Sequence, residues 1–282
     1  MSLLQQASVA RPPGRPVATS SSFYMAMRIL PPFQRQAMYE IYAFCRAVDD
    51  IADDPGPRQV RMAALQRWQE DLVRLYSGMG VTDLTLGLAM PVKTFDLRLE
   101  DFLAVVRGMQ MDVAEDIRAP KWEMLDLYCD RVASAAGRLS VRIFGIAERE
   151  GLDLAHHLGR ALQMTNILRD VDEDARMGRL YLPDEALSAV GIASRDITQV
   201  LGHPSFGQAC MLVADRARQH FAEADAVGLR CRRAAVRSPR LMSSVYRAIL
   251  HRLIERGWAP PRTPVRPTRS QILWPILRYG FF

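Results

Sequence analysis

The sequence predicts an all-α protein. Apolar residues recur at intervals of three and four along most of the chain, which is the spacing that places side chains on one face of an α-helix. No convincing segment alternates between apolar and polar residues, as a half-buried β-strand would. The clearest helical run comprises Met38, Ile41, Tyr42, Cys45, Val48 and Ala52.

Further helical runs follow this one in order along the chain. They cover roughly 58–77, 97–112, 121–146, 153–175, 205–227 and 238–257. Turn-forming segments separate them, such as Asp54-Pro55-Gly56-Pro57, Ala119-Pro120 and Gly202-His203-Pro204. The runs show no repeat of fixed length, which argues against a helical solenoid.

One helical domain is expected over residues 20–258, because a single large all-helical core can reach this length. Residues 1–19 are rich in Pro, Gly, Ala and Ser without periodicity, so we expect a flexible arm. Residues 259–282 read as an extended proline-rich connector and an apolar tail that is too short to span a bilayer. The tail could pack on the helical body, or its Trp, Tyr and Arg side chains could rest at a membrane interface.

The net charge of +6 favours anionic partners, and arginine carries almost all of it, since Lys93 and Lys121 are the only lysines. Nucleic acid is not expected, because the basic residues are scattered and no binding motif is present. Four widely separated cysteines suit neither a zinc site nor a disulfide framework. With no continuous apolar signal segment, we expect a cytoplasmic protein, or one attached peripherally to the inner face of the membrane.

The first acidic patch closes the helical run that begins near Met38. Asp49 and Asp53 lie four residues apart, so their carboxylates stand one helical turn apart on the side that carries Tyr42 and Arg46. Facing a core, the two charges require a cation, and Mg²⁺ prefers carboxylates and phosphate oxygens. The spacing alone fits equally well an acidic helix end in solvent, and we assign Asp50 and Asp54 to solvent.

The second patch is a longer polar stripe. Asn166, Asp170 and Asp174 follow one another at intervals of four, with Gln163 one turn earlier. Apolar neighbours on the same run indicate a buried helix, so the stripe must face a cavity or a partner. Two such stripes on buried helices predict one metal-lined cavity.

Two other clusters are assigned no role in chemistry. Asp112 and Asp116 repeat the spacing of four without a basic residue on their face, so we expect a solvated or capping pair. The adjacent His156 and His157 read as a helix surface feature and not as a ligand pair, because neighbouring helical positions point about 100° apart.

From Ser20 to about Trp258 the chain resembles the squalene and phytoene synthase family. The second family signature is matched by Gly159, Gln163, Asn166, Arg169-Asp170, Asp174 and Arg179-Leu180-Tyr181-Leu182-Pro183. The first is matched by the run from Tyr128 to Gly137, in which Ala136 replaces a larger aliphatic residue. The closest likeness is to hopanoid-associated members that make presqualene diphosphate, carried by Ser21-Ser22-Phe23-Tyr24, Cys45-Arg46-Ala47-Val48-Asp49-Asp50-Ile51-Ala52-Asp53 and Gly137-Arg138-Leu139-Ser140.

The resemblance implies an isoprenoid-synthase-type helical bundle around a central cavity. It implies metal ligands at Asp49, Asp53, Asn166, Asp170 and Asp174, and catalytic roles for the four aspartates with Tyr128 and Tyr181. It implies substrate or diphosphate contacts at Thr19, Ser20, Ser21, Ser22, Phe23, Tyr42, Arg46, Gln163, Arg169 and Tyr246, along with Asn166. Thr19 could equally cap a helix, and Tyr246 could equally be a core aromatic.

The implied reaction is the head-to-head (1′-1) condensation of two farnesyl diphosphates to presqualene diphosphate, with several Mg²⁺ ions and without NADPH. Downstream enzymes of hopanoid synthesis are implied as partners. Phytoene synthase, acting on two geranylgeranyl diphosphates, is an alternative, as is squalene or dehydrosqualene synthase. A helical binding protein, whose acidic stripes only pair with its arginines, is the non-enzymatic alternative.

Overall fold

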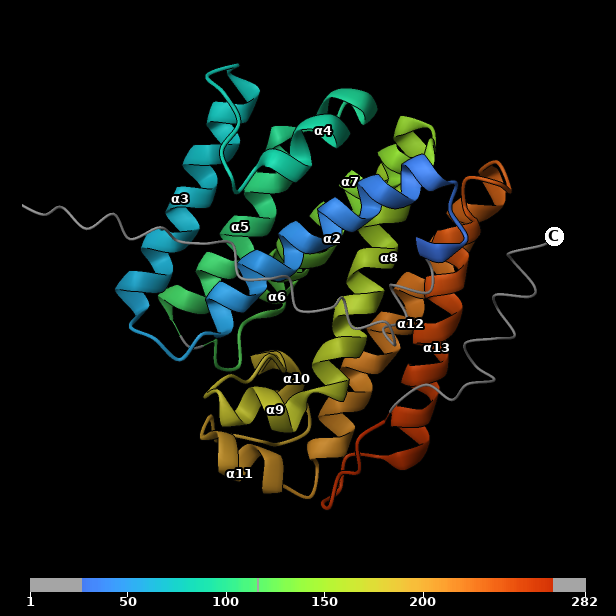
Figure 1. The fold of residues 1–282 in the computed structure, drawn as a ribbon. Coiled ribbons are helices and arrows are strands. Elements are labelled where there is room, and N and C mark those ends of the chain that lie inside the picture. The colour runs from blue at the N-terminus through green and yellow to red at the C-terminus, as the bar shows by residue number, and fades with distance from the viewer. Residues whose placement is uncertain (1–26, 116, 266–282) are drawn as a thin grey trace, which may run out of the picture.

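The structure, a computed structural model, describes residues 27–115 and 117–265 (Figure 1). Over these residues the chain folds into helices joined by loops, and no β-strand is present there. A single parallel bridge joins Arg118 to Leu180. It connects the loop that follows the helix ending at Ala114 to the loop that follows the helix ending at Arg176. The predicted all-α fold is confirmed.

The helices of the described residues follow the predicted order closely. They are α2 (Pro32–Asp53), α3 (Arg58–Tyr76), η1 (Leu86–Leu88), α4 (Ala89–Phe95), α5 (Leu99–Ala114), α6 (Trp122–Cys129), η2 (Asp130–Ser134), α7 (Ala135–Phe144), α8 (Glu148–Arg169), α9 (Val171–Arg176), α10 (Asp184–Ala189), α11 (Ile197–Gly202), α12 (Phe206–Arg230) and α13 (Arg237–Arg256).

Two of the predicted runs are interrupted. The run 121–146 contains the π-helical turn η2 between α6 and α7. The run 153–175 breaks at Asp170, whose backbone (φ −102°, ψ 13°) leaves the helical region between α8 and α9. Aspartate is a poor residue for a helix interior, since its carboxylate competes for local hydrogen bonds, and here it bonds the guanidinium of Arg169.

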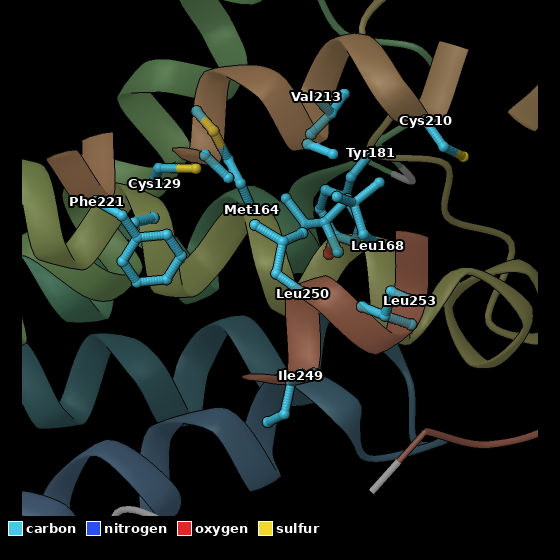
Figure 2. Packing of buried hydrophobic residues seen from close by; sticks show 14 of the residues in the cluster. Cys129, Met164, Leu168, Tyr181, Cys210, Val213, Phe221, Ile249, Leu250 and Leu253 are labelled. Carbon is cyan, nitrogen blue, oxygen red and sulfur yellow. The ribbon is translucent and has the colours of Figure 1, made fainter. Parts of the chain in front are cut away.

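The core has two parts, and α7 contributes buried residues to both, whereas α8 contributes to one. Figure 1 shows α7 and α8 near the middle of the molecule. One part packs α2, α3, α5 and α7 against each other, with Phe44 and Phe102 in edge-to-face contact at 5.2 Å between ring centroids. The other joins α8, α12 and α13. Figure 2 shows Met164 and Leu168 of α8 packed among apolar side chains of the two later helices. The end of α8 that carries the second patch is therefore fixed by buried contacts.

The helix α8 also approaches η2 very closely. Gly159 has no side chain, and an added Cβ would stand 2.7 Å from the backbone nitrogen, the Cα and the hydroxyl of Ser134. The nearly buried Arg160 follows it and donates to both oxygens of Asp126, at 2.8 and 2.9 Å. This bidentate pair compensates the burial of the guanidinium.

Residues 259–265 carry no helix, and they follow Trp258, which contacts the end of α8. The indole of Trp258 donates to the carbonyl of Leu168 at 3.0 Å, and Arg262 bonds Asp172 at 2.6 Å. No helix of the described residues is long and apolar enough to cross a membrane. The expected arm at 1–19 and the apolar tail from Ile272 to Phe282 lie outside the described residues.

Candidate active site

The last two turns of α2 place Asp49 and Asp53 on one side of the helix. Arg46 donates to Asp49 at 2.6 Å and to the exposed Asp50 at 2.7 Å. The side chain of Asp49 is 38% exposed, and its burial, together with the charge of Asp53, raises its pKa to about 6. Tyr42 is half-buried one turn before Arg46. The two carboxylates of the first patch differ: Asp49 is half-buried, whereas Asp53 is 44% exposed, so the expectation that both face inward holds only for Asp49. Asp50 is solvated.

The second patch runs from the end of α8 across the break into α9. The amide of Asn166 donates to the side-chain oxygen of Gln163 at 3.4 Å, while its own side-chain oxygen is buried and has no hydrogen-bond partner. Asp170 accepts two bonds from Arg169, at 2.7 and 2.6 Å. Burial and the neighbouring Asp170 raise the pKa of Asp174 to about 8. The three predicted ligands therefore lie together despite the break in the helix.

Asp112 on α5 lies inside the protein, so the expectation of a solvated or capping residue was wrong for it. It is 5% exposed and accepts bonds from the hydroxyls of Tyr128, at 2.9 Å, and Tyr181, at 2.6 Å. The two tyrosine rings stack with centroids 5.0 Å apart. Because these partners come from other segments, inspection of its own helix face could not find them. Asp116 lies outside the described residues.

Arg179 joins the first patch to the second, and sequence reasoning assigned it no role. Its nearly buried guanidinium donates to Asp53 at 2.8 Å and to the carbonyl of Ala52 at 3.1 Å. The same positive charge counteracts the upward shifts in the pKa of Asp112 and of Asp174, both of which arise first from burial. The available signal was its place in the Arg-x-Tyr-x-Pro element of the matched second signature, two residues before Tyr181.

The carboxylates of the two patches belong to one electrostatic site. The charge of Asp112 contributes to the raised pKa values of Asp49 and Asp174, and the charge of Asp53 contributes to the raised pKa of Asp112. Several carboxylates that share a partly buried space repel each other, and this repulsion favours a bound cation. Oxygen ligands and the unpartnered Asn166 oxygen suit Mg²⁺, which binds carboxylates and keeps sites for phosphate oxygens.

The sequence pattern described as squalene/phytoene synthase matches residues 17–271. The chain belongs to the squalene/phytoene synthase family. It is 55% identical to a presqualene diphosphate synthase of Sinorhizobium fredii over 94% of this chain and 95% of that one. A presqualene diphosphate synthase of Rhodopseudomonas palustris is 52% identical over 94% of each chain. A solved squalene synthase of Alicyclobacillus acidocaldarius is 30% identical and superposes with a TM-score of 0.76, over 84% of this chain and 89% of that one.

Membership of this squalene/phytoene synthase family makes the chain a prenyltransferase with the predicted helical fold. A late helix also reaches the second patch, since Tyr246 of α13 is half-buried and hydrogen-bonds Arg169. Tyr246 also packs against the apolar core, so the predicted substrate contact and the core-aromatic alternative both stay predictions. Thr19, Ser20, Ser21, Ser22 and Phe23 lie outside the described residues, so their predicted diphosphate contact stays a prediction.

Proposed function

We propose that this synthase condenses two farnesyl diphosphates head to head (1′-1) into presqualene diphosphate, with release of one diphosphate. The observation that carries the proposal is the pair of presqualene diphosphate synthases that are more than half identical over nearly the whole of both chains. The acidic site supports the same chemistry, because an allylic C–O bond breaks only when the charge on the departing diphosphate is neutralised.

We propose further that the two patches hold Mg²⁺. Asp49 and Asp53 on one side, with Asn166, Asp170 and Asp174 on the other, would be its protein ligands. When bound, the ion neutralises the diphosphate and makes it a better leaving group. The buried, unpartnered oxygen of Asn166 is the structural support for this assignment, since a buried polar atom without a partner is costly unless a ligand satisfies it.

The arginines around the patches would bind the diphosphates directly. Arg46 and Arg169 each pair with an aspartate of their own patch, so each guanidinium already lies beside the proposed binding site. Arg179 is held by Asp53 and bridges the patches. A planar guanidinium binds phosphate through two parallel hydrogen bonds, which orients the group as well as neutralising it.

The tyrosine pair offers a path for the proton that leaves when the cyclopropane closes. After the double bond of the acceptor attacks C1 of the donor, a C–H bond at that carbon must break, and its electrons form the last ring bond. Burial raises the pKa of Tyr128 and of Tyr181, so both stay protonated phenols and neither is a tyrosinate base. A phenol that donates to Asp112 can accept a proton at its oxygen while it passes its own proton to the carboxylate. Released diphosphate is the alternative acceptor.

Product identification tests the proposed function. The purified full chain is incubated with Mg²⁺ and either farnesyl or geranylgeranyl diphosphate, with and without NADPH, and the products are identified by mass spectrometry. We expect presqualene diphosphate from farnesyl diphosphate whether or not NADPH is present. Phytoene from geranylgeranyl diphosphate as the main product, or squalene formed with NADPH, would overturn the assignment.

A peripheral membrane contact would suit the hydrophobic product and its transfer to the next enzyme of hopanoid synthesis. The support is compositional, since Trp274, Arg278 and Tyr279 are side chains that rest well at a bilayer interface. Co-sedimentation of the full chain with anionic vesicles, compared with a Trp274→Ser variant, tests the contact. Equal and negligible binding of both proteins would exclude it.

A further inference from the structure

Three of the five histidines of the chain come together on the surface between α8 and α12. His156 and His157 belong to α8, and His220 belongs to α12. Each offers a ring nitrogen, and the three nitrogens all lie within 4.8 Å of one another. The expectation of a surface feature holds for the exposed His156, whereas His157 and His220 are half-buried. The sequence pattern of α8 alone contains no sign of the third residue.

The distances between the rings suit ligands of one metal ion. The Nδ1 atoms of His157 and His220 are 3.0 Å apart. Two nitrogens bound to one tetrahedral zinc ion at 2.0–2.1 Å are about 3.3 Å apart, so a small movement brings both onto a single ion. The ring of His156 lies near both others, with centroids 4.7 Å from His157 and 5.9 Å from His220.

The backbone around the cluster is held firmly. The carbonyl of His156 accepts bonds from the hydroxyl of Ser134 at 3.2 Å and from the guanidinium of Arg160 at 3.3 Å. This part of α8 also packs against η2 at Gly159, where no side chain intervenes. The cluster therefore rests on helices that are already fixed, which lowers the cost of holding ligands in position.

The positive charges near the cluster are partly offset. Arg160 and Arg216 would repel a cation, but Arg160 is paired with Asp126 at 2.8 Å and with Asp130 at 3.2 Å. Arg216 lies over the ring of Trp122, 4.6 Å from its centroid. The two aspartates also lie near His156, where their charges oppose that of Arg160.

We propose that His156, His157 and His220 form a second metal site, which binds a transition metal ion of the zinc class and ties α8 to α12. Water would complete the coordination shell of the ion. Imidazole ligands select zinc, nickel and copper, whereas Mg²⁺ prefers oxygen, so this site and the acidic site bind different ions. His156 precedes Asn166 by ten residues, or about 15 Å along α8, and the metal would act on the stability of the helix pair and not on the reaction.

Binding of Zn²⁺ to the full chain without an affinity tag tests the site. Titration calorimetry is carried out with excess Mg²⁺, so that the acidic site is occupied. We expect one Zn²⁺ per chain, and a rise in the unfolding temperature on binding. His157→Gln and His220→Gln should each weaken binding by about 100-fold or more, because loss of an outer hydrogen bond to a metal ligand already costs about 10–100-fold. The control His251→Gln removes an exposed histidine of α13 and should bind Zn²⁺ as the wild type does.

The visible spectrum of bound Co²⁺ reports nitrogen ligands directly and should disappear in the same variants. Circular dichroism checks that the variants fold, and if His220→Gln does not, the exposed His156→Gln replaces it. Absence of Zn²⁺ binding by the wild type at concentrations on the order of 100 μM would overturn the proposal, since a Kd of that size already corresponds to a weak site of only about −5.5 kcal/mol. Unchanged affinity in the folded variants would overturn it too, because the ion would then lie elsewhere.

Discussion

Replacement of Gly159 by alanine tests the packing that supports both the acidic site and the histidine cluster. The added methyl group would stand 2.7 Å from three atoms of Ser134, two of them in the backbone. Backbone atoms of η2 cannot turn aside as a flexible side chain would, so α8 and η2 must move apart by several tenths of an ångström. Because α8 also carries Asn166 and Arg169, the movement shifts side chains of the second acidic patch.

The expected loss of stability follows from two opposing effects. Overpacking of a close-packed core costs about 1–3 kcal/mol, and the higher helix propensity of alanine returns up to about 1 kcal/mol. We expect a net loss of about 1–2 kcal/mol. For a domain of this size each kcal/mol corresponds to about 2–4 °C in Tm.

Two other glycines provide graded controls. At Gly137 an added Cβ would meet Ala155 at 3.2 Å, so Gly137→Ala should cost less than Gly159→Ala. At Gly207, near the start of α12, nothing lies within 4 Å, and Gly207→Ala should be neutral or slightly stabilising. Urea unfolding measures the three variants, and turnover of farnesyl diphosphate should fall in the same order. Equal stability of the Gly159→Ala and Gly207→Ala proteins would refute the close approach of α8 and η2.

Further predictions concern the charges of the site. Asp112→Asn keeps the shape of the side chain but removes the carboxylate that accepts hydrogen bonds from both tyrosine hydroxyls. Single-turnover rates should therefore fall on the order of 100-fold or more. An unchanged rate would exclude the proposed proton path. Arg179→Met leaves Asp53 and Asp112 without their buried cation. The free energy of unfolding, measured in urea, should fall by about 3–5 kcal/mol. A loss under about 1 kcal/mol would contradict the bridging role of Arg179. Arg160 lowers the pKa of Asp126 below its ordinary 3.8. The free energy of unfolding of Asp126→Asn should therefore fall below that of the wild type by its full amount above pH 4, and this deficit should shrink as the pH falls further. A deficit that stays constant down to pH 2 would contradict this.

The helices and the two acidic patches could be predicted because their signals are local. A spacing of three and four residues fixes the face of a helix, and the same spacing brought Asp49 beside Asp53 and aligned Asn166 with its neighbours. The apolar residues around that stripe predicted a packed helix, and Leu168 and Val171 are indeed buried, while the stripe itself is half-buried.

The parts that escaped prediction depend on residues far apart in the chain. Asp112 looked solvated because its own helix offers no partner, whereas its partners Tyr128 and Tyr181 arrive from segments 16 and 69 residues later. The histidine cluster needed His220, 63 residues after His157. A π-helical turn leaves no periodic signature over five residues, so η2 was read as part of one continuous helix.

The central claim is that the two acidic patches form one site that needs Mg²⁺. Turnover of farnesyl diphosphate, measured against Mg²⁺ concentration, tests it in Asp53→Asn, in Asp170→Asn and in the control Asp215→Asn, which alters an exposed aspartate of α12. We expect that both site variants lose turnover while keeping their helix content, that the control behaves as the wild type, and that chelation of Mg²⁺ stops the wild type. Full turnover in either site variant, or in the chelated wild type, would contradict the account.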